Sequence, residues 1–570
     1  MIGSSASAPD SAGRPRLALD HSSCREVEGL GVTTVLIGQC IASDAEVRAA
    51  EGDLRRLMSL PGAFSAALVE ERDVVLVSDA SAQFPLYVAT AGERVVFGSR
   101  AGEVTEQVGR RPDLVHLAAQ IVLPQVPELL VSRTAFSGVR QLEPGTAFRV
   151  SAGDTTRVTP LIADESRRFD DCAEELRECL RGAISARTST GAALSSDFSG
   201  GLDSTSLAFL AAREVDELSV VTYAQEGASV DDDVRYAELC GRLDPRFRHR
   251  VVTAVGQHLP YQDWPVSADL PHPSGLAMGP VRLRMAAASG TTHLVGEGGD
   301  LVLGAPLGYF VDLARRGDLT TLWRHCSAWA RLRHRSSLAL FRRSVRLAAM
   351  NRRQGLTAFA RRLERPRSEQ TVPFWEERAI TSWGSPSCDW LAPQAREALA
   401  GHLMDLADGD DHMDACDRAM LVQLDYMGAT QRTVRETGAL YGIDVHAPFL
   451  DSEVVRVCLS LPAWRRCDPA SPKPLLRKAL QGLVPQVVLS RRTKGDYTGT
   501  AHMGIRRNLS ALRELLAEPV SADLGLIEPR RVRTALERAA QGLETPWAPL
   551  NQVLAIELWL RELTGGVADA

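Results

Sequence analysis

The stretch SGGLDST, Ser199–Thr205, lies between a strand-like segment, AALSSDF, and a helix-like segment, SLAFLAARE. Its two glycines let backbone N–H groups approach an anion closely, and hydroxyl groups at Ser199, Ser204 and Thr205 add donors. The helix that follows directs the positive end of its dipole at the same place. Asp203 would repel a bare phosphate, so its presence indicates Mg²⁺ bound between carboxylate and phosphate. The stretch predicts a phosphate-binding loop; the alternative is a plain turn with a helix cap.

A second glycine loop, GEGGD, Gly296–Asp300, follows the strand-like segment THLV. It offers Asp300 as a second carboxylate for Mg²⁺ and Glu297 as a polar group nearby. In parallel sheets, ligands bind at the carboxyl ends of the strands, where both loops fall. We therefore predict a metal–nucleotide site whose metal ligands are Asp203 and Asp300.

The segments around these loops alternate between strand and helix from about residue 170, which predicts an α/β fold with a parallel sheet covered on both faces. Residues 26–165 read as short strands separated by turns and predict a β-rich N-terminal domain; residues 1–25 read as a flexible tail. Residues 166–570 form the second predicted domain, with a helical insert at about 310–420. Within it, Ala314–Arg367 contains fifteen arginines against Asp318 and Glu364 as the acids. Those arginines are interpreted either as solvated helix faces or as a site for an acidic partner.

The bulk composition excludes several classes of protein. A net charge of −6 does not favour a nucleic-acid binder, and no apolar run is long enough to predict a membrane span. The first sixteen residues lack the apolar core of a secretory signal. The ten cysteines contain no CxxC pair. Free thiols in a cytoplasmic protein are the expectation.

Several further stretches give the chain a family resemblance. SGGLDS is similar to the pyrophosphate loop of the N-type ATP pyrophosphatases. Together with GEGGD, the stretches HAPFLD (446–451), KPLLRKAL (473–480) and RRTKGDY (491–497) resemble the asparagine synthetase B superfamily. The segments PGAFSAALVEERDVVLVSDASAQFPLYVA and LEPGTAFRV resemble the glutaminase domain of that superfamily, which is of the N-terminal nucleophile type.

The resemblance implies ATP and Mg²⁺ as cofactors and an acyl-adenylate as the activated carboxylate. The pyrophosphate is then expected on Ser199, Gly200, Gly201, Ser204 and Thr205, with Asp203 and Asp300 on the metal. Further nucleotide contacts are expected at Val221, in a strand similar to the adenine-binding strand of the family, and at Gly298, Gly299 and Lys473.

One departure narrows the expected activity. The glutaminase of the family uses a cysteine at the N-terminus after removal of Met, whereas this chain has Ile2 there and its first cysteine is Cys24. The N-terminal domain is therefore expected to lack its nucleophile. The ending RRTKGDYT resembles the lasso peptide cyclases, which join an α-amine to an Asp or Glu side chain of one peptide. That resemblance implies a core peptide as substrate, with a leader-binding protein and a leader peptidase as partners. An ammonia-dependent asparagine synthetase-like or β-lactam synthetase-like enzyme and a degenerate nucleotide-binding module remain alternatives.

Lysine is scarce in this chain, which has Lys473, Lys478 and Lys494 and otherwise uses arginine. Lys494 matches the family's lysine beside the acyl-adenylate, where a fixed cation stabilises developing negative charge. An ammonium group follows a moving charge more easily than a planar guanidinium group does. The amine must also lose a proton, and Glu297 or Glu436 is the expected base or its positioning group.

Overall fold

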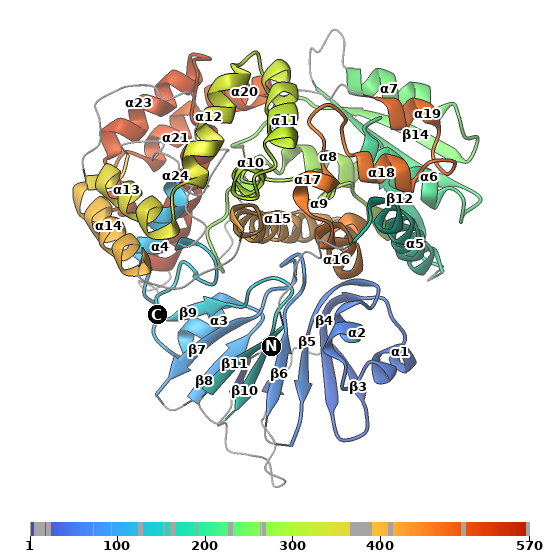
Figure 1. Ribbon diagram of the computed structural model, residues 1–570, viewed down its shortest axis with the longest axis horizontal. Coiled ribbons are helices and arrows are strands. Elements are labelled where there is room, and N and C mark those ends of the chain that lie inside the picture. The colour runs from blue at the N-terminus through green and yellow to red at the C-terminus, as the bar shows by residue number, and fades with distance from the viewer. Residues whose placement is uncertain are drawn as a thin grey trace.

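The computed structural model describes most of the chain. The described residues are 2–4, 17–18, 24–71, 73–92, 94–122, 129–151, 154–159, 167–189, 191–225, 232–262, 264, 269–364, 390–407, 414–491 and 498–565. Two sheets occupy the N-terminal part, and a mixed α/β part with many helices lies above them (Figure 1). The predicted mixed α/β class, with an N-terminal sheet domain, is confirmed.

The N-terminal part is built from two antiparallel sheets. Their orders are β2-β1-β8-β7-β9 and β11-β10-β6-β5-β4-β3. The strands are β1 (Ile2–Ser4), β2 (Leu17–Ala18), β3 (Cys24–Glu28), β4 (Thr33–Cys40), β5 (Gly62–Val69), β6 (Val74–Val77), β7 (Tyr87–Ala91), β8 (Arg94–Gly98), β9 (Val139–Gln141), β10 (Ala147–Ser151) and β11 (Asp154–Thr159). The helices are α1 (Asp44–Ala49), α2 (Leu54–Met58), α3 (Ala101–Glu106) and α4 (Leu114–Ile121).

The two sheets pack face to face and each carries helices on its other face. Leu76 of one sheet and Phe97 of the other belong to the buried cluster between them. Leu57 of α2 covers the outer face of the six-stranded sheet, and Val104 of α3 lies with Tyr87 over the five-stranded one. Side chains that alternate along antiparallel strands serve both faces in this way, so the order of layers is helix, sheet, sheet, helix.

Two segments of the stretch 1–25, for which a flexible tail is predicted, are strands instead. β1 pairs antiparallel with both β2 and β8, with Ile2 opposite Gly98. Pairing with the exposed edge of β8 satisfies the backbone groups of these residues, a long-range interaction that local composition does not encode. The structure therefore describes these residues as paired strands.

A third sheet, which is parallel, begins after residue 190. Its order is β14-β13-β12-β15-β16, so the chain starts in the middle and then fills both sides. The strands are β12 (Leu194–Asp197), β13 (Leu218–Ala224), β14 (Phe247–Thr253), β15 (Thr292–Leu294) and β16 (Asp444–His446). Helices α5 (Phe169–Thr188), α6 (Leu202–Ala211), α7 (Asp232–Gly241), α8 (Gly279–Ala287) and α9 (Gly299–Val302) accompany it. Ligands of such doubly wound sheets bind where the order reverses, at the ends of β12 and β15.

The remaining helices lie around the parallel sheet and beside it (Figure 1). They are α10 (Tyr309–Arg315), α11 (Leu319–Leu332), α12 (Ser337–Ala348), α13 (Arg352–Glu364), α14 (Pro393–Ala407), α15 (Ala415–Ala439), α16 (Ser452–Ser460), α17 (Ala463–Arg466), α18 (Pro474–Ala479), α19 (Gln486–Ser490), α20 (Thr498–Arg507), α21 (Leu509–Leu515), α22 (Val520–Asp523), α23 (Pro529–Ala540) and α24 (Trp547–Gly565). The buried Trp559 of α24 packs edge-on against Phe136 of the N-terminal part. Among the described helices, none has the length and apolar character that a bilayer crossing requires.

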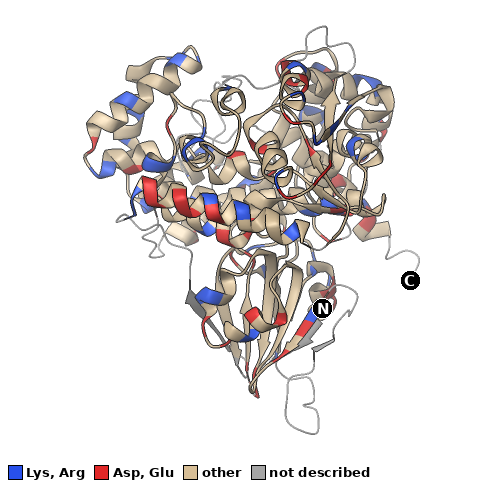
Figure 2. Cartoon of the chain, turned by 90° about the vertical axis from the view of Figure 1, so that its right-hand side faces the viewer, with Lys and Arg blue, Asp and Glu red and all other residues tan. Residues whose placement is uncertain are grey.

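Side-chain hydrogen bonds join the N-terminal sheets to the parallel sheet. Gln39 Nε2 donates to Asp444 Oδ1 over 2.7 Å, and Arg432 Nη1 donates to the carbonyl of Ala82 over 2.5 Å. Gly428 of α15 lies so close to the Ser81 carbonyl that a Cβ would overlap it. Figure 2 shows the two parts meeting along this seam, with charged residues of both signs on the surrounding helices.

The HAPFLD stretch forms a buried ion pair behind the parallel sheet. Asp451 accepts two hydrogen bonds, over 2.7 and 2.8 Å, from Arg187 of α5, and each side chain is only 2 % exposed. Arg187 Nε also donates to His446 Nδ1 over 3.1 Å. Removing one partner of such a pair leaves an uncompensated buried charge, which costs about 3–5 kcal/mol.

We expect Arg187→Met to lower the thermal unfolding midpoint clearly, because Asp451 is left buried without its partner. Arg181→Met on the same helix is the matched control, since Arg181 is half-exposed and its pair with Glu178 contributes about 0–1 kcal/mol. Differential scanning fluorimetry of both variants measures the difference. Equal midpoints for the two variants would show that the Arg187–Asp451 pair does not stabilise the fold.

Candidate active site

The predicted phosphate loop lies between β12 and α6, at the carboxyl end of the central strand. Ser199 and Ser204 join their hydroxyls over 2.9 Å, and the N–H of Gly201 donates to Ser199 Oγ over 3.2 Å. These bonds fold the loop back on the first turn of α6. Thr205 Oγ1 is buried and has no hydrogen-bond partner within the described part of the chain. The loop therefore presents N–H and hydroxyl donors at a helix N-terminus, the arrangement that binds phosphate groups.

Close backbone packing requires glycine at three positions of the two loops. Gly200 has a φ of +67°, and a Cβ there would lie 2.6 Å from the backbone N of Ala237 on α7. In the second loop, a Cβ on Gly296 would lie 2.7 Å from Ser204 N, and one on Gly299 would lie 2.6 Å from Asp203 Cγ. The second loop is thus pressed against the first turn of α6, as the sequence predicts for neighbouring strand ends.

Asp203, Asp300 and Lys473 meet at the edge of these loops. The Lys473 ammonium contacts Asp203 Oδ2 and lies 2.6 Å from Asp300 Oδ1. Lys473 caps the N-terminus of α18 in a left-handed conformation, with φ +47° and ψ +58°. This conformation costs a lysine about 1–2 kcal/mol, so packing and the two carboxylates hold it there. Both predicted metal ligands therefore reach a single cation.

The donor set fits Mg²⁺ bound together with a nucleotide. Among the described residues there is no cluster of three or more side chains that could hold a metal ion alone. Mg²⁺ typically uses one or two protein carboxylates and takes its remaining oxygens from water and substrate phosphates. Asp203 and Asp300 are placed to supply those two carboxylates. Bound there, Mg²⁺ would supply positive charge next to the phosphates.

A buried polar network supports the phosphate loop from behind. Arg284 of α8 contacts Asp197, the last residue of β12, and His293 Nε2 lies 3.0 Å from Asp197 Oδ1. Burial opposes ionisation of this carboxyl, but Arg284 and His293 hold the pKa of Asp197 below its usual range. Sequence reasoning missed these residues. The position of Asp197, just before the phosphate loop, could have indicated its role. Its partners Arg284 and His293 are distant in sequence, so no local pattern indicates them.

Arg491 fixes the start of the RRTKGDY stretch to the phosphate loop. Its Nη1 donates to the Ser199 carbonyl over 3.2 Å, and its Nη2 contacts Asp233 of α7. The guanidinium carbon also lies 4.4 Å from the centre of the Tyr236 ring. Lys494, the predicted catalytic cation, lies outside the described residues. Arg491, which sequence reasoning did not single out, is the described residue that ties this stretch to the site.

The other predicted residues occupy three different positions. Glu297, Gly298 and Gly299 lie in the second loop, where Gly298 adopts a φ of +86° and caps α9. Val221 is buried within β13, and its carbonyl accepts the N–H of Phe198 over 2.8 Å. Glu436 is exposed near the end of α15. No hydrogen bond or ion pair among the described side chains joins Glu436 to the phosphate loop.

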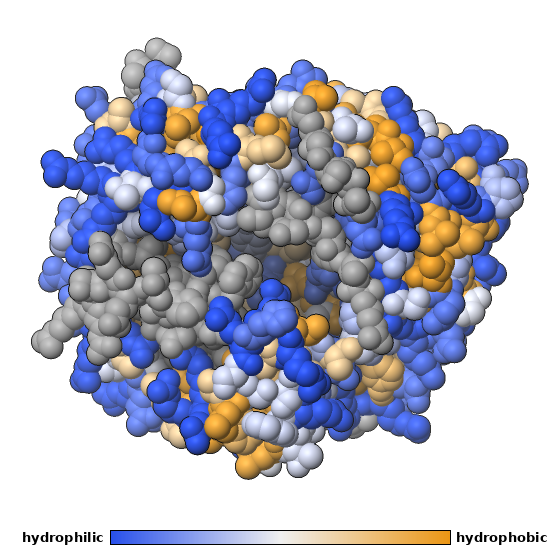
Figure 3. All heavy atoms as spheres, turned by 90° about the horizontal axis from the view of Figure 1, so that it is seen from above, coloured by the Kyte–Doolittle hydropathy of each residue, from blue (hydrophilic) through white to orange (hydrophobic). Residues whose placement is uncertain are grey.

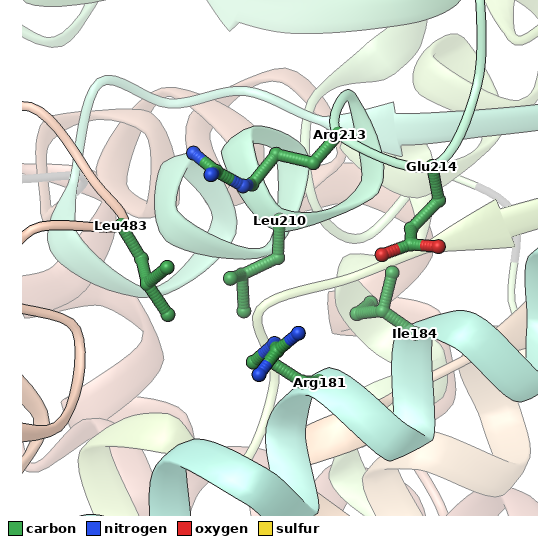
Figure 4. Close-up of a pocket in the computed structure, with 6 residues that line it drawn as sticks. All are labelled: Arg181, Ile184, Leu210, Arg213, Glu214 and Leu483. Atoms are coloured by element: carbon green, nitrogen blue, oxygen red, sulfur yellow. The ribbon is translucent and has the colours of Figure 1, made fainter.

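A small pocket elsewhere on α6 is separate from this site. It lies near the carboxyl end of α6, the end opposite the phosphate loop, and has a volume of about 60 Å³. Figure 4 shows Arg181 and Ile184 of α5 pointing toward Leu210 at the end of α6. Its place on the far end of the helix excludes it from the nucleotide site.

The two cysteines of the N-terminal part are built into strands. Cys24 begins β3 and pairs with Ile37, and strands β1 and β2 precede it in the chain. Cys40 ends β4, where burial raises the pKa of its thiol to about 11. A thiol with so high a pKa is a poor nucleophile, and the amide nitrogen of Cys24 is not a free α-amine.

Comparison with known proteins supports a family. The asparagine synthase family model matches residues 175–561. Proteins of Mycobacterium bovis and Mycobacterium tuberculosis, named as candidate glutamine-hydrolysing asparagine synthetases, are 28 % identical over 484 residues, covering 77 % of this chain and 67 % of theirs.

Solved structures give weaker matches. An allosteric regulatory enzyme of purine biosynthesis matches at 11 % identity over 39 % of this chain and 60 % of its own, with a TM-score of 0.16. A glutamine phosphoribosylpyrophosphate amidotransferase of B. subtilis matches at 12 % identity over 40 % and 62 %, also with a TM-score of 0.16. These scores are too low to support an inference. The family model, in contrast, spans most of the chain and contains both glycine loops and Lys473. The chain therefore belongs to the asparagine synthase family.

Proposed function

We propose that this protein is an ATP-dependent peptide macrolactam synthetase of the lasso peptide cyclase type. It activates an Asp or Glu side chain of a core peptide as an acyl-adenylate and joins it to the peptide's N-terminal α-amine, with release of AMP and pyrophosphate. Membership of an amide-forming, ATP-dependent family supports the ligase activity. The observation that carries the site assignment is the convergence of Asp203, Asp300 and Lys473 at the phosphate loop.

The first step is attack of the substrate carboxylate on the α-phosphorus of ATP, which breaks the bond to pyrophosphate. The N–H and hydroxyl groups of Ser199, Gly201 and Ser204 would hold the departing pyrophosphate at the N-terminus of α6. Asp203 and Asp300 would hold Mg²⁺. The Lys473 ammonium would then leave the two carboxylates and bind a phosphate oxygen. It would have a negatively charged partner both before and after ATP binds.

The second step is attack of the α-amine on the acyl carbon, with AMP as the leaving group. Negative charge grows on the acyl oxygen and on the α-phosphate, and we assign Lys494 to that charge. Arg491 is anchored at the Ser199 carbonyl, and three residues of chain span at most about 11 Å. The anchoring of Arg491 at the phosphate loop supports assigning Lys494, three residues further along the chain, to this charge. Glu297 is the proposed base, or the group that orients it, for the amine proton.

The N-terminal part supports a substrate amine in place of ammonia released from glutamine. Cys24 lies within the ladder of β3 and β4, and Cys40 has a thiol whose pKa is raised by burial. Neither resembles an N-terminal thiol nucleophile with its own free amine. The N-terminal part contacts Asp444 of the parallel sheet and helix α15, and we assign it a structural role there.

A second candidate function is asparagine formation from aspartate and free ammonia. This function is favoured by the mycobacterial relatives, which are named as asparagine synthetases and match 77 % of this chain. It uses the same adenylation chemistry and differs only in the carboxylate and in the amine. For the macrolactam function, the proposed partners are the precursor peptide, a leader-binding protein and a leader peptidase.

The two functions are separated by one parallel assay. The protein is supplied with ATP, Mg²⁺ and either aspartate with ammonium or peptides that carry a free α-amine and an internal Asp or Glu. Pyrophosphate release and product mass are measured in each. We expect peptide-dependent pyrophosphate release and a product lighter by one water. Asparagine formation, without any peptide-dependent release, would overturn the macrolactam assignment.

A further inference from the structure

The segment 319–363 has an unusual charge distribution. It contains eleven arginines and no aspartate or glutamate, although the whole chain carries a net charge of −6. Helices α11, α12 and most of α13 lie within this segment. On the upper face of the molecule, where α11 and α12 lie in Figure 1, hydrophobic side chains stand among hydrophilic ones (Figure 3).

A strip of apolar side chains crosses from α11 to α12. Trp323 of α11 packs edge-on against Phe341 of α12, with ring centres 5.6 Å apart. Leu319 lies one turn before Trp323, and Leu338 and Val345 lie one turn on either side of Phe341, so each shares a helix face with its neighbour. We call these five residues, Leu319, Trp323, Leu338, Phe341 and Val345, the α11–α12 strip.

The strip remains substantially exposed. The exposed fraction is 48 % for Leu319, 47 % for Trp323, 45 % for Leu338 and 39 % for Val345. Single exposed apolar residues are ordinary, but a contiguous group bordered by charge is typical of an interaction surface. Tryptophan and arginine are also the residues that contribute most to binding at such surfaces.

Arginines border the strip on α12. Arg342 lies one turn after Leu338, and Arg346 follows Val345; both are exposed. Within the described part of the chain, neither forms an ion pair with a carboxylate, and segment 319–363 has no carboxylate to offer them. Guanidinium groups bind carboxylates through two parallel hydrogen bonds, which gives such a surface a preference for acidic groups.

We propose that the α11–α12 strip and its arginines bind an acidic polypeptide segment that carries apolar side chains. The charge of segment 319–363 complements acidic residues, and the strip complements apolar ones. A nucleic acid would use the arginines but leave Leu319, Leu338 and Val345 without a partner. A bilayer favours helices whose apolar side chains project freely, whereas Trp323 is packed against Phe341. The proposal concerns binding alone and does not depend on the proposed function.

The test uses a fluorescent peptide of about 14 residues, four helical turns, in which glutamates alternate with leucines at helical spacing. Fluorescence anisotropy with the full chain, without ATP, measures its affinity. The variants are Trp323→Ser, which interrupts the strip, and Arg342→Gln/Arg346→Gln, which removes charge. The matched control is Arg55→Gln/Arg56→Gln, which removes equal charge from exposed positions on α2.

We expect saturable binding that weakens with added salt and falls about tenfold in each of the two variants. The control variant should bind as the unaltered protein does. The proposal is overturned if the peptide does not bind saturably, or if the control loses as much affinity as the Arg342/Arg346 variant. It is also overturned if an oligonucleotide, or vesicles of anionic phospholipid, compete for the protein better than the peptide does.

Discussion

Asp203→Asn is expected to reduce pyrophosphate release roughly 100-fold or more, because it removes one of two carboxylates that meet at the phosphate loop. The substituted amide would keep the shape of the side chain but not its charge, so the affinity for Mg²⁺ falls and ATP binding becomes less dependent on the metal. Calorimetric titration of ATP at several Mg²⁺ concentrations, together with a pyrophosphate assay, measures both effects. Asp300→Asn should change the same two quantities in the same direction.

The matched control for this prediction is Asp216→Asn. Asp216 is exposed and follows the carboxyl end of α6, the end opposite the phosphate loop. Its substitution therefore removes the same charge at a position that does not contact the loop. It should leave pyrophosphate release within about twofold of the unaltered protein. Unchanged Mg²⁺ dependence in both Asp203→Asn and Asp300→Asn would refute the assignment of these carboxylates to a metal.

Lys494→Ala is expected to abolish most product formation while leaving ATP binding nearly intact. A cation that stabilises charge only during reaction contributes to kcat and little to ground-state binding, and its loss typically costs about 100- to 1,000-fold in rate. Lys494→Arg should restore only part of the rate, because a planar guanidinium group cannot replace a compact ammonium group at this position. Single-turnover product formation and equilibrium ATP binding measure the two quantities separately.

Lys478→Ala is the control for that substitution. The Lys478 side chain is half-exposed on α18 and lies 3.4 Å from Asp170, away from the loops. It should retain nearly normal kinetics, because an exposed ion pair contributes little. Normal product formation by Lys494→Ala would show that the scarcity of lysine had pointed to the wrong residue.

The sequence predicts the residues of the two glycine loops better than the residues that hold these loops in place. SGGLDST and GEGGD each contain their chemistry within a few residues, and the structure brings Asp203 and Asp300 together as expected. Lys473 was expected on phosphate, but its left-handed conformation and its contacts to both carboxylates depend on how α18 packs, which short-range sequence does not specify. Arg284, His293 and Arg491 act through partners far away in sequence, so no local pattern could identify them.

The first strand of the N-terminal part also depends on a partner that is distant in sequence. Ile2–Ser4 resembles any polar tail in composition, and it becomes a strand only because the edge of β8 is available to it. The presence of Ile2 where the family has a cysteine was, in contrast, a purely local observation, and the structure adds that Cys24 and Cys40 lie within a sheet. A motif whose functional groups lie within a few residues can therefore be predicted from the sequence, whereas strand pairing and contacts between distant residues can be seen only in the structure.

The most direct test of the proposed chemistry follows the oxygen atoms of the substrate carboxylate. A peptide with a free α-amine and a side-chain carboxylate labelled with the heavy isotope of oxygen is incubated with the protein, ATP and Mg²⁺. We predict that mass spectrometry will find the label in AMP, because the carboxylate oxygen that attacks the α-phosphorus departs with AMP when the amide forms. Formation of unlabelled AMP, or of ADP and phosphate in place of AMP and pyrophosphate, would contradict adenylation at this site.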